Sequence, residues 1–163
     1  MKFKTKTEEI KYLKSKIRKY KRLSFYDDLT SLFNGRKLKR DIKRLCYDYK
    51  RYGHKFIAIL LDIDNFKKIN DTKGHLVGDK ILIKVAKAIK NSIRETDRAY
   101  RLSGDEFIVL LPHSNIKSAN KIIKRINKFC NQKFSYGIGT GKKPKQLLKE
   151  IDKRMYENKR SKK

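Results

Sequence analysis

Several features that define common protein classes are scarce or missing in this chain of 163 residues. Its two cysteines, Cys46 and Cys130, are isolated, which excludes a disulfide framework or a C-x-x-C metal site and indicates two core thiols in a reducing compartment. No apolar run reaches the ~18 residues that a membrane-spanning helix needs, and the basic start of the chain lacks the apolar region of a signal peptide. We therefore expect a soluble, cytoplasmic protein.

Acidic residues are also few, with 17 Asp and Glu against 45 Lys and Arg, so the formal net charge is +28. Such an excess of positive charge attracts polyanions, and non-specific binding to nucleotides, nucleic acid or an anionic membrane surface is expected. A general enrichment in lysine explains the charge equally well, because Lys is scattered through every segment. A protein built to bind nucleic acid is disfavoured, since the sequence has no basic stripe interleaved with aromatic residues.

The few acids are grouped rather than spread out. Two short stretches, residues 61–64 and 103–107, carry carboxylates beside the apolar, β-prone runs 56–61 and 107–111. Either stretch alone would be read as a solvated turn. Together, at the edges of two strands, they indicate a divalent metal site on a sheet, and a metal in so positive a protein indicates phosphate chemistry.

Hydrophobic periodicity and turn signals predict helices over residues 8–24, 35–52, 65–70, 76–93, 115–130 and 144–159. They predict strands over residues 55–61, 98–102, 106–111 and 133–139. Asn34 or Thr30 is expected to cap the second helix, and Gly53 to close it. Without the first helices and the insertions, the order β-α-β-β-α-β remains. This is an α+β fold of the ferredoxin-like or palm type, with a central antiparallel sheet flanked by helices.

The domain organisation is an N-terminal helix in residues 1–24 followed by one domain over residues 25–163. Four side chains of the helix form an apolar seam at steps of three and four residues, surrounded by basic residues: Ile10, Leu13, Ile17 and Tyr20. The seam spans only two heptads. It is equally suited to packing on its own domain and to serving as a dimerisation stalk.

The two acidic stretches can meet in such a core. Asp62 directly follows the first strand and Asp105 lies at the tip of the hairpin, and the strand and the hairpin are neighbours. Two carboxylates with a backbone carbonyl, such as that of Ile63, make a hard oxygen site suited to Mg²⁺ or Mn²⁺. Glu106 points to the other strand face if the hairpin is regular, and joins the metals if the turn is distorted.

The segment after Asp62 has residues suited to a nucleotide. Lys67 and the backbone N–H groups at the start of the short helix can hold a triphosphate. An Asp accepts two parallel N–H bonds, as guanine offers, so Asp79 together with Asn70 can select guanine, and a carboxylate there argues against adenine. On position alone, Asn70 and Asp79 could equally well be helix caps.

The chain resembles the GGDEF domain, the diguanylate cyclase family, over residues 25–160. Residues 27–34 resemble its D-x-L-T-G-L-x-N motif, and residues 62–79 match D-I-D-x-F-K-x-I-N-D-x-x-G-H-x-x-G-D at every fixed position. Residues 101–107, R-L-S-G-D-E-F, resemble R-Y-G-G-D-E-F. Residues 134–139 and 155–159 fit the late strand and the final Y-x-x-K.

The resemblance implies that two GTP molecules condense into cyclic di-GMP with release of pyrophosphate. The reaction would be a metal-assisted attack of a 3′-hydroxyl on an α-phosphate. Metal would be bound by Asp62, the Ile63 carbonyl, Asp105 and Glu106, or Glu106 would instead help to activate the hydroxyl. Asp105, Glu106 and Lys67 would carry the catalysis. The implied substrate-binding residues are Phe66, Lys67, Asn70, Asp79, Arg101 and Lys159.

The resemblance also implies a partner and a regulatory site. Each domain would hold one GTP, so a homodimer is needed for catalysis, and repulsion between highly basic protomers makes it transient. Arg94 and Asp97 form an R-x-x-D pattern where the family binds cyclic di-GMP as an inhibitor. A salt-bridged turn is the simpler reading of the same two residues.

Three positions depart from the family pattern. Ser103 replaces the first Gly of the signature, Gly35 replaces the Arg after Asn34, and no G-R-N follows Lys159. These departures leave an alternative, a silent domain that binds GTP or cyclic di-GMP and signals by contact. The complete set of Asp62, Asp105 and Glu106 favours the enzyme, because a receptor has no need of all three.

Overall fold

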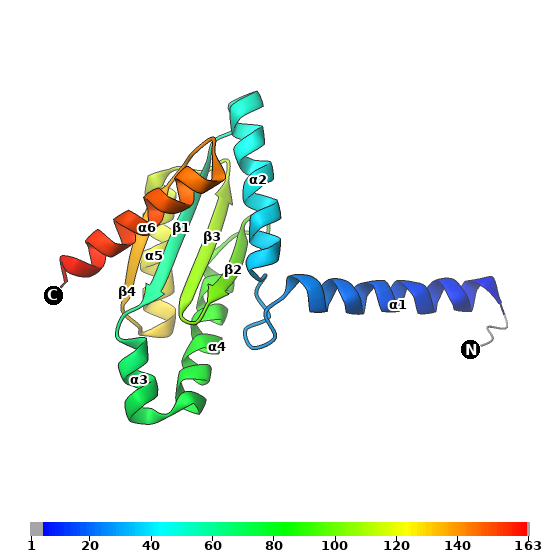
Figure 1. Ribbon diagram of the computed structural model, residues 1–163, viewed down its shortest axis with the longest axis horizontal. Helices are drawn as coiled ribbons and strands as arrows, with labels where there is room; N and C mark the ends of the chain where they lie inside the picture. The colour runs from blue at the N-terminus through cyan, green and yellow to red at the C-terminus, as the bar shows by residue number, and fades with distance from the viewer. Residues whose placement is uncertain (1–4, 163) are drawn as a thin grey trace.

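The computed structural model describes residues 5–162, except for the side chains of residues 21 and 22. This part of the chain forms helices α1 Lys6–Phe25, α2 Gly35–Tyr52, α3 Phe66–Lys73, α4 His75–Ser92, α5 Ile116–Cys130 and α6 Pro144–Arg160. Its strands are β1 Phe56–Ile63, β2 Arg98–Ser103, β3 Glu106–Pro112 and β4 Phe134–Gly139. They form one antiparallel sheet in the order β2-β3-β1-β4 (Figure 1). The predicted α+β fold is confirmed.

Strand β1 lies in the middle of the sheet and is buried on both faces, as its continuous apolar run predicts. Ile57, Ile59 and Leu61 point into a core shared with α4 and α5. Ala58 and Leu60 point into a second core shared with α2 and α6. Each fully buried aliphatic side chain contributes on the order of 1.5–3 kcal/mol to the hydrophobic stabilisation. The two helix layers therefore hold β1 from both sides.

The strand is longer than predicted. It continues through Asp62 to Ile63, because Asp62 pairs with Glu106 on one side and with Ser135 on the other. Asp62 therefore lies within the strand rather than after it. A carboxylate within a central strand has a fixed orientation, set by the alternation of side chains along the strand.

The ends of α2 are fixed by the residues that the sequence indicated. The Asn34 side chain accepts hydrogen bonds from the backbone N–H groups of Arg36 and Lys37. Gly53 has φ 71° and donates its N–H to the carbonyl of Tyr49. The alternative cap, Thr30, instead donates to Asp27 in the preceding loop.

Both cysteines are buried free thiols, as predicted. Burial raises the pKa of Cys46 to about 11, and burial also raises the pKa of Cys130. A thiol with a raised pKa has little thiolate at neutral pH and so little reactivity. Cys46 and Cys130 therefore act as buried packing residues of the core.

Helix α1 extends away from the body of the protein (Figure 1). The four seam residues are between 48 and 63% exposed: Ile10, Leu13, Ile17 and Tyr20. The alternative in which this seam packs on its own domain is therefore wrong. Near the junction, the guanidinium of Arg40 lies over the ring of Phe25.

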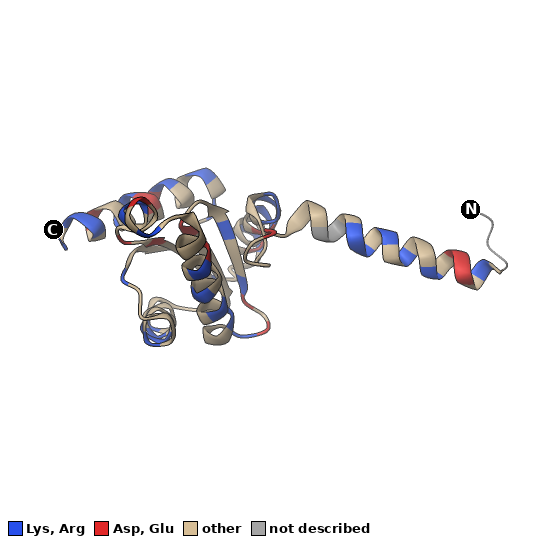
Figure 2. Cartoon of the chain, turned by 90° about the horizontal axis from the view of Figure 1, so that it is seen from below, with Lys and Arg blue, Asp and Glu red and all other residues tan. Residues whose placement is uncertain are grey.

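Lys and Arg lie along α1 and on the helices of the body, consistent with the scattered charge of the sequence (Figure 2). Among residues 5–162, no helix combines the length and the apolar character needed to cross a bilayer.

Helix α6 lies unusually close to β4. At Gly137, an added Cβ atom would overlap with the carbonyl oxygen of Ile151, so only glycine allows this approach. The contact sets the distance of the whole helix from the sheet, including the position of Lys159 near its end.

We predict that Gly137→Ala lowers the free energy of unfolding by about 1–3 kcal/mol, the usual cost of forcing an extra methyl group into a packed contact. Denaturant-induced unfolding measures this. Gly35→Ala is the matched control: its nearest neighbour would be a Leu102 side-chain carbon at 3.6 Å, an ordinary contact. Equal stabilities of the two variants would show that the close approach is not a constraint.

Candidate functional site

A row of four polar residues crosses the sheet at the end of β1. The strand pairing joins Ser103 to Glu106, Glu106 to Asp62, and Asp62 to Ser135. Residues paired across neighbouring strands share a face, so all four side chains lie on the face covered by α2 and α6. Towards the other end of β1, this face is apolar, with Leu60 next in line. The row therefore marks the place where the core ends and a polar site begins.

The row decides between the two alternatives for Glu106. A register shift lies between Arg101 and Ser103, so the hairpin is distorted. Glu106 lies beside Asp62 because β3 pairs with β1 in an unbroken register, and the shift within β2 brings Ser103 opposite Glu106. The expectation for a regular hairpin is wrong, and the distorted turn is the arrangement observed.

Asp105 lies in the turn next to this row. Desolvation by burial and the negative charge of Asp62 raise its pKa, while Lys159 and Arg101 act in the opposite direction. Asp62 pairs with Glu106, the residue that follows Asp105, so the two acidic stretches lie side by side. The expected meeting of the two acidic stretches is therefore observed.

Lys159 reaches the same place from the end of α6. Its Nζ atom lies 2.7 Å from Oδ1 of Asp62, whose side chain is only 11% exposed. The hydrogen bond to Asp62 is the main cause of a raised Lys159 pKa, and Asp105 and Asp64 add to it although burial opposes it. The ammonium is therefore the positive charge that balances this acidic cluster.

Ser103 fits its position without backbone strain. It is not among the residues with positive φ, whereas Gly104 has φ 46°. The need for glycine in this turn therefore falls on Gly104, which is present. The Ser103 hydroxyl lies 3.0 Å from Oε2 of Glu106 and donates to it, so the substitution adds a contact to the row.

Arg101 joins the hairpin to the loop before α2. Its Nε atom donates to the carbonyl of Gly104 at 2.9 Å, and its Nη1 atom lies 3.3 Å from both carboxylate oxygens of Asp27. Although burial opposes it, hydrogen bonds from Thr30 and the charge of Arg101 leave the pKa of Asp27 below its usual value. Arg101 thus positions the turn that carries Asp105, and its contact with a substrate stays a prediction.

The corner between α3 and α4 contains an unsatisfied polar atom. Among the described residues, Oδ1 of Asn70 is the one buried side-chain polar atom without a hydrogen-bond partner. It faces Gly78, where an added Cβ would overlap with it. A buried acceptor without a donor is unfavourable by about 1–3 kcal/mol, so rotation of the Asn70 amide towards a ligand that donates would be favoured.

The alternative reading of Asn70 and Asp79 as helix caps is wrong. Helix α4 begins after Gly74, and its cap makes no side-chain hydrogen bond. Asn70 lies inside α3, and Asp79 lies in the second turn of α4. Phe66 is buried in the core beneath this corner, so it supports the corner from below. Lys67 is exposed in the first turn of α3.

The oxygen donors fit a hard divalent cation. Asp62 and Glu106 are neighbours in the row, and the charge of Asp62 raises the pKa of Asp105 in the adjoining turn. The Lys159 ammonium shows that Asp62 already binds a cation. Within residues 5–162, no three acidic, His or Cys side chains converge as they stand on one metal position. The side chains would therefore have to adjust around a metal held by Asp62, the Ile63 carbonyl, Asp105 and Glu106.

Three further residues at the site were given no role from the sequence: Asp64, Ser135 and Lys162. Asp64 accepts a hydrogen bond from Ser135, and Lys162 Nζ lies 3.0 Å from Oδ2 of Asp64. The i, i+2 spacing places Asp64 on the same strand face as Asp62, and this signal could have identified Asp64. Ser135 and Lys162 carry no local signal, because only the strand register and the approach of α6 bring them there.

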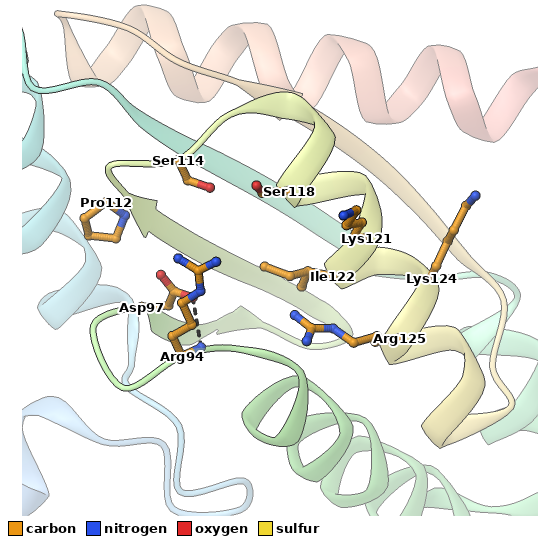
Figure 3. A pocket seen from close by; sticks show the side chains of 9 residues that line it. All are labelled: Arg94, Asp97, Pro112, Ser114, Ser118, Lys121, Ile122, Lys124 and Arg125. Carbon is orange, nitrogen blue, oxygen red and sulfur yellow. Dashed lines mark hydrogen bonds between the residues drawn. The ribbon is translucent and has the colours of Figure 1, made fainter.

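A second polar site lies around Arg94 and Asp97, in a pocket of about 490 Å³ (Figure 3). Asp97 is buried and accepts a hydrogen bond from the backbone N–H of Arg94 at 2.9 Å, not from its guanidinium. The simple salt-bridged turn is therefore not what is observed. Basic side chains of α5 line the same pocket and were missed in the sequence: Lys121, Lys124 and Arg125.

Comparisons with known proteins identify the family of this chain. The family described as diguanylate cyclase, GGDEF domain, matches residues 24–163. Diguanylate cyclase DgcS of Shewanella oneidensis is 34% identical over 150 residues, which cover 85% of this chain and 50% of that protein. The chain spans half or less of the length of the first curated relatives that it matches.

Solved structures show the same fold. Diguanylate cyclase SiaD of Pseudomonas aeruginosa, in complex with its activator SiaC, has a TM-score of 0.83 at 27% identity, covering 95% of this chain and 65% of that one. The coiled coil and GGDEF domain of DgcB from Caulobacter crescentus, in complex with c-di-GMP, has a TM-score of 0.88 over 95% of this chain and 91% of that one. Its 24% identity supports the fold alone. By the family match and the identity to DgcS, this chain belongs to the diguanylate cyclase GGDEF domain family.

Proposed function

We propose that this chain is a diguanylate cyclase domain that condenses two GTP molecules into cyclic di-GMP and releases two pyrophosphates. The observation that carries the proposal is the polar row, which places Glu106 beside Asp62 with Asp105 in the adjoining turn. Three acids and one lysine at one end of a sheet suit phosphoryl transfer, and membership of the diguanylate cyclase family indicates which transfer it is.

Each half of the reaction forms one bond and breaks one. The 3′-oxygen of one GTP bonds to the α-phosphorus of the other, and the bond from that phosphorus to the bridging oxygen of pyrophosphate breaks. When bound, Mg²⁺ or Mn²⁺ supplies the positive charge that this transfer requires. Asp62, the Ile63 carbonyl, Asp105 and Glu106 would hold it.

The other groups act on the substrate itself. As the alternative to holding metal, Glu106 can accept the proton of the 3′-hydroxyl through Oε1, which Ser103 does not engage. Lys67, exposed in the first turn of α3, and Lys159 would neutralise phosphate oxygens. Arg101 would act through the turn that it holds, by keeping Asp105 in place.

Guanine would bind at the corner of α3 and α4. If the Asn70 amide rotates away from Gly78, its oxygen can receive one N–H of the base, and the Asp79 carboxylate can receive the two parallel N–H bonds of the guanine edge. This pairing gives the unsatisfied Oδ1 atom the donor that it lacks in the protein alone.

Dimerisation is the remaining requirement, because the two nucleotides must face one another. We propose that the exposed seam on α1 forms the dimer contact, since two half-exposed apolar stripes gain by covering each other. The high positive charge opposes the contact, and the two bound triphosphates would reduce that repulsion.

A second candidate function is a silent domain that binds GTP or cyclic di-GMP and signals by contact. The pocket around Arg94 supports it, because the pocket is separate from the acidic row and does not depend on turnover. The assay for product formation distinguishes the two functions.

Purified protein with Mg²⁺ and GTP is expected to form cyclic di-GMP, identified by chromatography and mass spectrometry. Turnover per protomer should rise with protein concentration, because two chains must meet. Asp105→Ala should lower the rate at least about 100-fold, while its circular dichroism matches that of the parent. No dinucleotide at high protein concentration would rule out the cyclase and leave the binding module.

The guanine assignment predicts a change in base selectivity. Asp79→Ala should weaken binding of a non-hydrolysable GTP analogue about 10- to 100-fold, the usual effect of losing hydrogen bonds to a charged group. It should affect the inosine analogue less, because that base lacks the 2-amino group. Gly78→Ala should also weaken binding, since its Cβ would displace Asn70.

The control for this experiment is Asp152→Asn, which changes the charge at an exposed position of α6. It should leave both affinities unchanged in equilibrium titrations. If Asp79→Ala retained the preference for guanine over inosine, the role assigned to Asp79 would be wrong.

We also propose that cyclic di-GMP binds in the pocket around Arg94 and inhibits the enzyme. The guanidinium of Arg94 is not held by Asp97, and the pocket adds three cationic side chains from α5 (Figure 3). A cyclic dinucleotide carries two phosphates, which such a pocket complements.

Arg94→Ala is expected to weaken cyclic di-GMP binding at least about tenfold, because a charge-assisted contact to phosphate is lost. Isothermal titration calorimetry with the dinucleotide measures this directly. Arg44→Ala, which removes an exposed guanidinium from α2, is the control and should bind as the parent does. Unchanged binding by Arg94→Ala would exclude the pocket as the site.

A further inference from the structure

The ion pair between Lys159 and Asp62 has a consequence for metal binding. The Asp62 side chain is 11% exposed, and Lys159 is its one salt-bridge partner in the described part of the chain. A carboxylate so far removed from water requires a cation beside it. Without metal, the Nζ atom of Lys159 meets that need at 2.7 Å from Oδ1.

The end of α6 is fixed, so only the side chain of Lys159 is free to move. On one side, Oδ1 of Asn158 accepts the backbone N–H of Tyr136 at 3.2 Å. On the other side, Lys162 donates to Asp64 and to the carbonyl of Phe134. The Lys159 side chain is 40% exposed, and it has the flexible four-carbon stem that lets an ammonium exchange partners.

A divalent cation and an ammonium repel each other, and both would use the same carboxylate. Oδ1 of Asp62 is taken by Lys159, and Asp105 and Asp64 also interact with that ammonium. A metal bound to Oδ1 of Asp62 therefore displaces Lys159, and a metal bound to the second oxygen would lie against the ammonium and repel it. The displaced ammonium needs another anion, and the triphosphate of a bound nucleotide is the one that the proposed function brings to this place.

We propose that Lys159 is a tethered cation that occupies Asp62 until metal and nucleoside triphosphate arrive together. The inference rests on the proposed function only for the identity of the triphosphate. Metal alone must compete with the Lys159 ammonium for the Asp62 carboxylate. When a triphosphate binds with the metal, the displaced ammonium can pair with the phosphate oxygens. By linkage, the metal and the nucleotide then each increase the affinity for the other by the same factor.

The test is the affinity of the full chain for Mn²⁺, followed by electron paramagnetic resonance. Without nucleotide, Lys159→Met should bind Mn²⁺ at least about fivefold more tightly than the parent, because a unit charge within a few ångströms of the metal is removed. Methionine keeps the length of the side chain and removes its charge.

Lys153→Met is the matched control. Lys153 lies on the same helix, its Nζ atom is 3.8 Å from an exposed Glu157 carboxylate, and its replacement changes the net charge by the same amount. An increase in Mn²⁺ affinity that both variants share is the general effect of lowering the positive charge. Only the additional increase in Lys159→Met reports the competition at Asp62.

A second arm repeats the titration with a non-hydrolysable GTP analogue at saturation. The parent should bind Mn²⁺ more tightly with the analogue than without it. The ratio of these two Mn²⁺ affinities should be smaller for Lys159→Met than for the parent. The inference is overturned if Lys159→Met binds Mn²⁺ no more tightly than Lys153→Met, or if the two ratios are equal. Neither outcome depends on turnover, so failure of the cyclase assay and failure of this inference are separate results.

Discussion

The pairing register of β1 between β3 and β4 is the constraint on which the rest of the site depends. Asp62 faces Glu106 on one side and Ser135 on the other because Leu60 and Ala58 hold the same face of the strand in the core. A slip of one residue would move every side chain of β1 to the opposite face. It would bury Asp62 against α4 and α5 and expose apolar residues, so the burial of the strand fixes the orientation of the acid.

The second requirement is the close approach of α6, which brings Lys159 to a carboxylate 97 residues earlier in the chain. Gly137 allows the approach, and Ile151 and Met155 fill the space against the sheet. The position of the ammonium is therefore set by this packing and by the contacts of Asn158 and Lys162 at the helix end, and not by the ion pair itself. Packing of this kind is rigid, so the lysine can exchange partners without movement of its helix.

The sequence predicts the fold well where the signals are local. Asn34 and Gly53 give the bounds of α2, because a side-chain cap and a left-handed glycine act on the nearest turn. The continuous apolar run of β1 gives its burial. Of the site, Asp62 and Asp105 could be expected to meet, since a strand and a hairpin that are neighbours bring their acids together.

Other parts of the site could not be predicted, because they depend on tertiary contacts. Glu106 lies beside Asp62 through the register of β3 on β1, and Ser103 joins them through a shift within β2, neither of which the sequence reveals. The unsatisfied acceptor of Asn70 follows from the packing of α3 on α4 at Gly78. Ser103 departs from the family signature, which has a glycine at this position. Its backbone conformation shows that the glycine requirement lies one residue later, at Gly104.

The hairpin of β2 and β3 connects the two polar sites. Asp105 lies at its tip, whereas Asp97 precedes β2 and Pro112 ends β3, at the other end. A strand of this length separates them by on the order of 20 Å. The core residues of β3 are buried and paired on both sides, which makes the hairpin stiff. A ligand in the pocket would therefore act less by bending the hairpin than by changing how two protomers approach, because the proposed reaction requires a second nucleotide to face the first.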